Sequence, residues 1–222
     1  LIMTNVRIPE TQRGDLLSMI GAARIGERRA RVLYDTYGEE TVNTFIEDLM
    51  SYGEFMMRAE IAKLKDGVYH SEVKGNEAST PIVCDLTIQG NEMTIDFSKS
   101  GPMSPAYINS PIANTYSSVY MALMTSVGKK IQHRCGGCYR PIKIITQPGT
   151  VTHAAYPATH GNCTNFIAKQ IIEAVWSALA QTAPKEVPAG WGSINYWVFS
   201  GLDPRRGEGY GTPDFLGCSS GA

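Results

Sequence analysis

Apolar residues recur at the three- and four-residue spacing of helices in the first third of the chain. Residues 15–37 carry this pattern, with Asp15 as the expected N-cap and Gly38 just past the expected end. Residues 40–64 carry two apolar stripes, so we expect that helix to be covered on more than one side, by the rest of the chain or by another subunit. The short turn between them predicts an antiparallel helical hairpin, which we assign to residues 1–66.

Strict alternation of apolar and polar residues predicts strands further along the chain. Two alternating runs flank Gly90 and Asn91 and predict a β-hairpin over residues 82–98. Shorter strands are expected at residues 67–75, 141–146 and 194–199, and a further helix at 114–127. Helices interleaved with antiparallel hairpins are typical of the α+β class, so we expect residues 67–222 to form a mixed α+β segment.

A polar loop leads into another amphipathic helix, residues 166–181. Asn162, Thr164 and Asn165 cluster at the junction, where the first amide N–H groups of a helix lack partners within the helix. Such a helix start can bind an anion or a carbonyl oxygen, and it can equally be capped by its own side chains. These three residues are therefore candidate substrate-binding residues, with self-capping as the alternative.

Two more polar residues extend this candidate site. His160 precedes Gly161, which allows a ligand to approach closely, so His160 is the candidate catalytic acid or base. Asn109 lies in a proline-rich loop and is a candidate to direct its amide into a cleft and bind substrate. The chain carries no Ser-His-Asp pattern, phosphate-binding loop or dinucleotide fingerprint, so these residues alone do not define a reaction.

The spacing of His133, Cys135 and Cys138 is the sharpest metal-like motif in the chain. A C-x-x-C turn brings two thiolates within reach of one tetrahedral zinc ion. A structural zinc site needs a fourth ligand, which would have to come from elsewhere in the chain. A redox pair and simple packing of a glycine turn are the alternatives.

Composition narrows the class of protein. The 222 residues are 43% apolar and 18% charged, which is typical of a folded domain. A net charge of −1 without a basic cluster argues against nucleic-acid binding. The chain holds no uninterrupted apolar run of the roughly 18 residues that a membrane span requires. The five scattered cysteines are expected to be reduced thiols of a cytoplasmic protein.

Short motifs follow one another along nearly the whole chain, beginning with NVRIPETQRGD and a helix that ends in GERRARVLYDTYG. The residues that carry these motifs are Asn5, Arg7, Pro9, Gly14, Asp15, Gly26, Arg28, Arg29, Tyr37, Gly38, Thr94–Ser98, Asn109–Pro111, Gly137–Pro141, Gly149–Thr150, Gly161–Asn162 and Asp203–Arg205. In this order they resemble the hydantoinase B/oxoprolinase family.

The resemblance implies that the chain is an internal fragment of a larger, multi-domain cytoplasmic subunit. In that family an ATP-binding, hydantoinase A-like partner activates a small-molecule substrate by phosphorylation. The hydantoinase B-like subunit then completes the hydrolysis of a cyclic amide such as 5-oxoproline or a hydantoin. We therefore expect a hetero-oligomer that uses ATP. The resemblance also implies a divalent metal whose histidine- and aspartate-rich motif lies upstream of Asn5, outside this sequence.

Two other functions stay open. A sister group of the family carboxylates ketones such as acetone or acetophenone, and residues 188–192, PAGWG, are more similar to that group. Alternatively, the segment serves structure and assembly without chemistry of its own, which the two apolar stripes of residues 40–64 would explain. Departures from the family pattern at residues 158–163, ATHGNC, and at Pro213–Phe215 are expected to reshape the substrate pocket.

Overall fold

A computed structural model describes residues 1–6, 8–74, 80–188 and 195–216. The chain divides into two compact units, Leu1–Ser51 and Tyr52–Ala222. The sequence predictions that concern Arg7, residues 189–192 and residue 194 fall outside the described residues. Among the described helices, none combines the length and the apolar character that crossing a membrane requires.

Two helices joined at Gly38 dominate the first unit: α1 (Pro9–Tyr37) and the beginning of α2 (Glu39–Ile61). The prediction that Asp15 caps α1 is wrong, because the helix already begins at Pro9. Proline is tolerated in a first helical turn, where its missing N–H would have had no partner within the helix. Gly38 ends α1 as predicted, with φ at 81°, a conformation that favours glycine.

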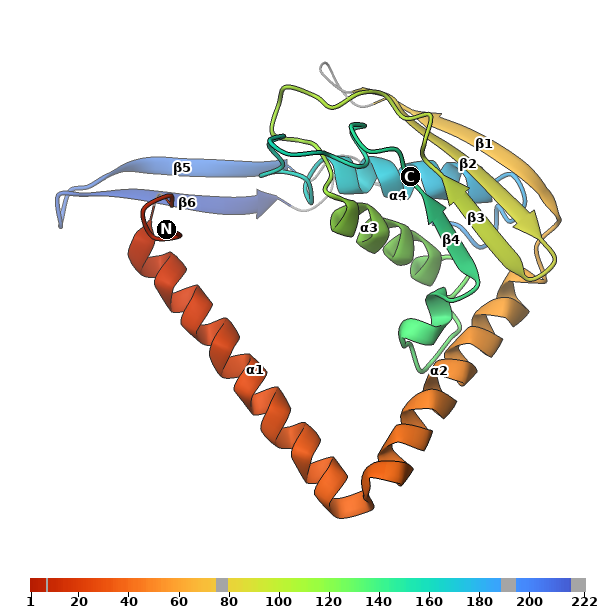
Figure 1. Ribbon diagram of the computed structural model, residues 1–222. Coiled ribbons are helices and arrows are strands. Elements are labelled where there is room, and N and C mark those ends of the chain that lie inside the picture. The colour runs from red at the N-terminus through yellow and green to blue at the C-terminus, as the bar shows by residue number, and fades with distance from the viewer. Residues whose placement is uncertain (7, 75–79, 189–194, 217–222) are drawn as a thin grey trace. The chain divides into compact units, whose positions relative to one another are not determined.

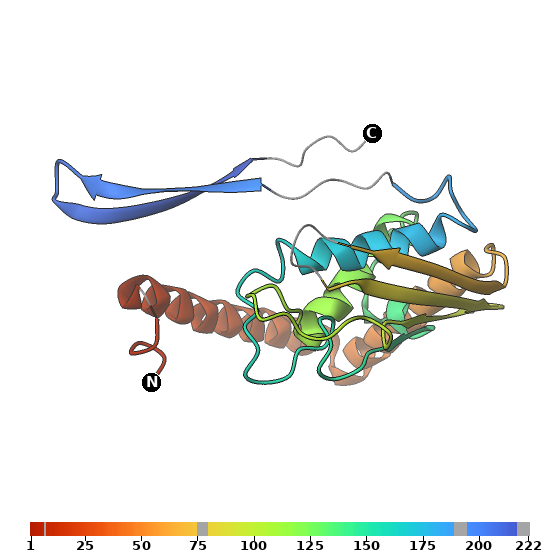
Figure 2. The same ribbon diagram turned by 90° about the horizontal axis from the view of Figure 1, so that it is seen from above.

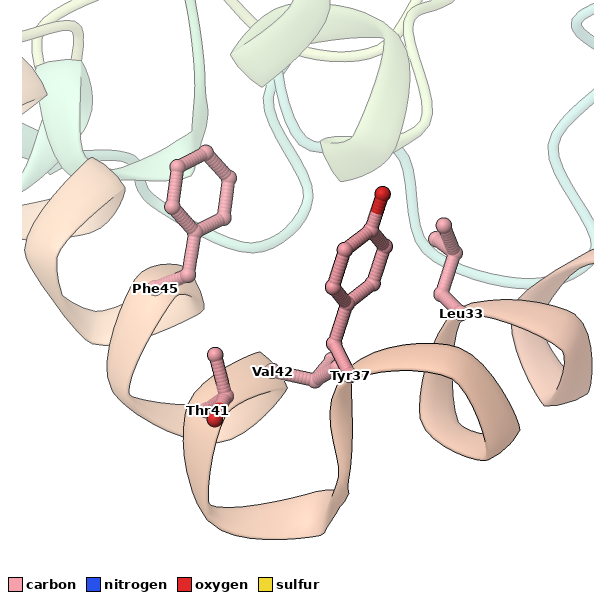
Figure 3. Close-up of a pocket in the computed structure, with 5 residues that line it drawn as sticks. All are labelled: Leu33, Tyr37, Thr41, Val42 and Phe45. Atoms are coloured by element: carbon pink, nitrogen blue, oxygen red, sulfur yellow. The ribbon is translucent and has the colours of Figure 1, made fainter.

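The first unit exposes many apolar side chains, and α1 buries none of its residues. Near the turn, Tyr34 Oη donates a hydrogen bond to Asn43 Oδ1 at 3.0 Å and so links the two helices. An apolar hollow of about 330 Å³ lies at the same turn. Its lining residues are Leu33, Tyr37, Thr41, Val42 and Phe45, of which Leu33, Tyr37 and Phe45 point to the same side in Figure 3.

A four-stranded mixed sheet forms the centre of the second unit, in the order β1-β2-β3-β4. Its strands are β1 (Gly67–Val73), β2 (Ile82–Gln89), β3 (Glu92–Asp96) and β4 (Ile142–Ile145). The first three are antiparallel neighbours and β4 pairs with β3 in parallel, after a long connection that contains α3 (Ile112–Thr125). The strands predicted from alternation are thereby confirmed.

The core lies between this sheet and two helices, α3 and α4 (Ile167–Leu179) (Figure 1). Leu86 and Ile95 are partners on neighbouring strands, and both are fully buried. The indole Nε1 of Trp176 in α4 donates to the Ala122 carbonyl of α3 at 3.0 Å. These helices and the sheet confirm the α+β class.

The C-terminal part of α2 packs into this core. Met57 and Ile61 are fully buried, whereas Phe45 and Phe55 stay exposed. Within the second unit, one face of the C-terminal part of α2 is therefore covered. Arg58 strengthens the attachment, because it binds Glu54 of its own helix and Glu92 at the start of β3, at 2.9 and 3.1 Å.

The last described segment is a two-stranded antiparallel hairpin of β5 (Asn195–Asp203) and β6 (Glu208–Leu216), drawn as a long ribbon in Figure 2. β5 extends beyond the predicted end at residue 199, and β6 is a strand that the sequence analysis did not predict. Gly207 permits the turn with φ at 69°.

Candidate functional site

Two loops that are far apart in the sequence meet at the candidate residues, and Asn109 joins them. Its side chain is fully buried. Its Oδ1 accepts the Ser104 N–H at 2.7 Å, and its Nδ2 donates to the carbonyls of Ser104, Ala106 and Thr159 at 2.9 to 3.0 Å. The amide therefore faces the protein interior, where we expected it to face a cleft.

Asn162 makes the second link between the same loops. Its backbone N–H donates to the Tyr107 carbonyl at 2.9 Å, and only 4% of the residue is exposed. Its Oδ1 accepts a hydrogen bond from Asn165 Nδ2 at 3.0 Å. Asn109 and Asn162 thus hold the loop that carries His160 against the loop that precedes α3.

Helix α4 begins at Ile167, and its N-cap residue Phe166 makes no side-chain cap hydrogen bond. Self-capping by Asn162, Thr164 or Asn165 was the alternative to substrate binding, and no such side-chain cap is present at the start of α4. Instead, the carbonyl of Asn162 accepts the N–H groups of Asn165 and Phe166, each at 3.2 Å. These turns satisfy the amide groups of two residues that lie just before the first residue of the helix.

The exposed rim of the joined loops carries the remaining candidates. His160 and Thr164 are exposed and Asn165 is partly exposed. His160 Nδ1 lies 3.2 Å from the Ala158 carbonyl. In the tautomer that donates this hydrogen bond, Nε2 is left as a proton acceptor. The structure thus brings the predicted residues into one region, with the two buried asparagines beneath and His160 on the surface.

Buried hydroxyl groups support this region, and sequence reasoning missed them. Ser110 Oγ and Thr115 Oγ1 are 2.8 Å apart, and Thr115 Oγ1 donates to the Thr152 carbonyl at 2.6 Å. All three residues are fully buried. Short hydroxyl side chains do not follow a periodic pattern in the sequence. Their role as buried hydrogen-bonding groups is therefore visible only in the three-dimensional structure.

The C-x-x-C segment forms a 3-10 turn, η1 (Gly136–Tyr139). Cys138 is fully buried, and burial raises the pKa of its thiol. His133 is exposed, and its ring centroid lies 6.2 Å from that of Tyr52. Among the residues that the structure describes, no three His, Cys, Asp or Glu side chains are grouped to hold a metal ion. His133, Cys135 and Cys138 therefore do not fit a zinc site, which was one of three interpretations of their spacing.

Sequence comparison connects the chain with known enzyme components. It is 34% identical over 212 residues to the beta subunit of caprolactamase from Pseudomonas jessenii, a match that covers 93% of this chain and 36% of that protein. It is also 34% identical over 221 residues to a protein named as the B subunit of a D-/L-hydantoinase from Pseudomonas sp. strain NS671, covering 90% of this chain and 36% of that protein. The chain thus spans about a third of the length of these relatives.

Solved structures share the fold. The ATP-dependent caprolactamase from Pseudomonas jessenii matches 94% of this chain and 37% of its own, with a TM-score of 0.80 and 32% identity. A nucleotide-free acetone carboxylase matches 83% of this chain and 27% of its own, with a TM-score of 0.70 and 14% identity, which shows a shared fold alone. The family model for hydantoinase B/oxoprolinase matches residues 1–222. The chain belongs to the hydantoinase B/oxoprolinase family.

Proposed function

We propose that the chain is part of the hydantoinase B-like subunit of an ATP-dependent enzyme that hydrolyses a cyclic amide. One observation carries this proposal: the 34% identity, over at least 90% of the chain, with components of a caprolactamase and of a hydantoinase. Both names describe the opening of a cyclic amide. We further propose a hetero-oligomer in the cytoplasm, in which a hydantoinase A-like partner holds ATP.

Within this function, we assign different roles to the buried and exposed candidate residues. Asn109 and Asn162 are positioning residues, because their hydrogen bonds hold the two loops together. His160 is the proposed general base, since it is exposed and its Nε2 can accept a proton. Thr164 and Asn165 are proposed to contact the substrate from the same rim.

A divalent metal is the cofactor that the family implies beside ATP. The described residues do not fit such an ion, because no three potential ligands are grouped among them. No step of the proposed reaction is therefore assigned to a metal held by this chain. The residues proposed here act by holding loops, contacting substrate and accepting a proton.

Ketone carboxylation is the competing chemistry. The acetone carboxylase match supports it only at the level of the fold, at 14% identity. The PAGWG segment that favoured it begins at Pro188, and its other four residues lie outside the described part of the chain. The cyclic-amide relatives are more than twice as similar in sequence, so we favour hydrolysis.

The reaction class is tested with the full-length protein produced together with its ATP-binding partner. Caprolactam, 5-oxoproline and hydantoins are supplied with ATP, and ring-opened product and ADP are measured. Ring opening that depends on ATP supports the proposal. Incorporation of labelled bicarbonate into acetone or acetophenone, without ring opening of any cyclic amide, would establish the carboxylase instead.

The proposed roles are tested in the same complex. We expect His160→Ala to lower kcat by roughly 100-fold, because general-base catalysis contributes on that order, and to leave the melting temperature unchanged. His133→Ala, a second exposed histidine, is the matched control and should retain full turnover. Unchanged turnover of His160→Ala would remove His160 from the chemistry and favour a structural role for this segment.

A further inference from the structure

Two thiols lie together where the 3-10 turn η1 meets helix α2. A Cβ atom placed on Gly53 would lie 2.5 Å from Cys135 Sγ and 3.2 Å from Cys138 Sγ. Both sulfur atoms therefore lie within 3.2 Å of one point above α2. A hydrogen bond between the two side chains is among the interactions that act on the Cys138 thiol.

The backbone of the turn suits a bond between these sulfurs. The Cys138 N–H donates to the Cys135 carbonyl at 3.2 Å, which closes a four-residue turn. The end residues of such a turn have Cα atoms less than about 7 Å apart, close to the separation that disulfides span. Gly136 and Gly137 lie between the two cysteines and give this segment the freedom to adjust.

The two thiols differ in access. Cys135 is partly exposed, whereas Cys138 is fully buried. A reagent in solution therefore reaches Cys135 first, and Cys138 is held beneath it as the second thiol. Cys84 provides a contrast, because it is fully buried in β2 and burial raises the pKa of its thiol to about 12.

We propose that Cys135 and Cys138 form a reversible disulfide when a hydroperoxide oxidises Cys135. In the first step, the Cys135 sulfur attacks the peroxide O–O bond, and with hydrogen peroxide the products are a sulfenic acid and one water. In the second step, the Cys138 sulfur attacks the Cys135 sulfur, the S–S bond forms and a second water leaves. Two thiols lose two hydrogen atoms and one peroxide becomes two waters. An external dithiol returns both electrons by exchange.

The folded, full-length protein is treated with hydrogen peroxide, and its remaining thiols are blocked before digestion with trypsin. The peptide Cys135–Lys143 holds both thiols, because trypsin cleaves poorly at Arg140–Pro141. We expect this peptide to lose two hydrogen atoms and to regain them with dithiothreitol. The matched control is Cys163→Ser, which removes another partly exposed thiol and should leave this result unchanged.

Single variants separate the two steps. In Cys138→Ser, the sulfenic acid on Cys135 has no partner beside it, so dimedone should label Cys135 strongly and label the wild type weakly. A comparable amount of dimedone on Cys135 in the wild type, with no loss of two hydrogens, would overturn the proposal. So would a disulfide that forms only after unfolding in urea, or one that joins two copies of the chain through Cys135.

Discussion

Gly53 of α2 lies directly beneath Cys135, and a methyl group at this position would approach Cys135 Sγ to 2.5 Å and the Cys138 backbone nitrogen to 3.1 Å. Glycine in the middle of a helix costs about 1 kcal/mol relative to alanine. Glycine is nevertheless required at residue 53, because the turn from Cys135 to Cys138 packs against the helix backbone and leaves no room for a side chain.

Replacing Gly53 by alanine should therefore destabilise the protein, although alanine is the better helix former. We expect a loss of about 1–3 kcal/mol in the free energy of unfolding, typical of an overpacked site. Gly21 of α1 is the matched control, since a Cβ there meets no atom within 4 Å, and Gly21→Ala should be neutral or stabilising. Urea unfolding of both variants measures the difference. Equal effects would mean that the turn does not press on α2.

Asn109→Ala should be among the most damaging single changes in the joined loops. It removes four hydrogen bonds, two of them to the N–H and carbonyl groups of the buried residue Ser104, at a cost of roughly 2–4 kcal/mol. Asn165→Ala, which removes one partly exposed hydrogen bond, should cost less than about 1 kcal/mol. Thermal unfolding of the two variants compares them, and similar melting temperatures would contradict the role of Asn109.

We expect Asp85 to make the stability of the fold depend on pH. Hydrogen bonds from Lys99 at 2.7 Å and His70 at 2.6 Å hold the pKa of the Asp85 carboxyl below its ordinary value. A lowered pKa in the folded state stabilises the fold above the unfolded-state pKa of about 3.9, and this stabilisation is lost as the pH falls through the folded-state pKa. Asp85→Asn should therefore lower the melting temperature at pH 7 and have a smaller effect below about pH 4.

The matched control for Asp85 is Asp35→Asn, at an exposed position of α1. This variant should leave the melting temperature close to that of the wild type at both pH values. If Asp85→Asn caused the same deficit at pH 7 and in acid, the cause would be lost packing, and the carboxylate charge would not contribute.

Hydrogen exchange should distinguish α1 from α4. None of the α1 residues is buried, whereas α4 buries nine of its thirteen residues. Amide protection follows the packing of the surrounding structure, so α1 amides of the isolated chain should exchange roughly 100-fold faster or more than those of α4. Mass spectrometry of peptic peptides measures both helices together. Equal protection of the two helices would contradict this prediction, because it would mean that the α1 amides are shielded from solvent although the α1 side chains are exposed.

Periodic apolar patterns predicted most of the fold. The alternation in residues 82–98 gave β2 and β3 correctly, because a sheet with one buried face imposes a period of two. The start of α1 was missed, because Asp15 was the expected N-cap although Pro9 fits a first helical turn. The parallel pairing of β4 with β3 could not be read from the sequence, since it depends on how the connection through α3 packs.

The sequence predicted where the candidate site lies, but it did not predict the role of each side chain there. Asn109 and Asn162 were singled out as polar residues in loops, and the structure links their loops. Sequence could not tell that the Asn109 amide faces inward, because burial in loops has no periodic signature. Similarly, C-x-x-C spacing places two sulfurs together, but the position of His133 relative to them depends on tertiary packing.

The order of the elements affects how this chain is made on the ribosome. The antiparallel strands β1 to β3 are complete by Asp96, whereas the helix that covers β1 and β2 is finished only at Leu179. During synthesis, the apolar side of this three-stranded sheet therefore stays exposed until the ribosome has added the residues of α4. Exposed apolar strands promote aggregation, so slower translation before residue 179, or loss of α4 by truncation, should increase the demand for chaperones and lower the yield of folded protein.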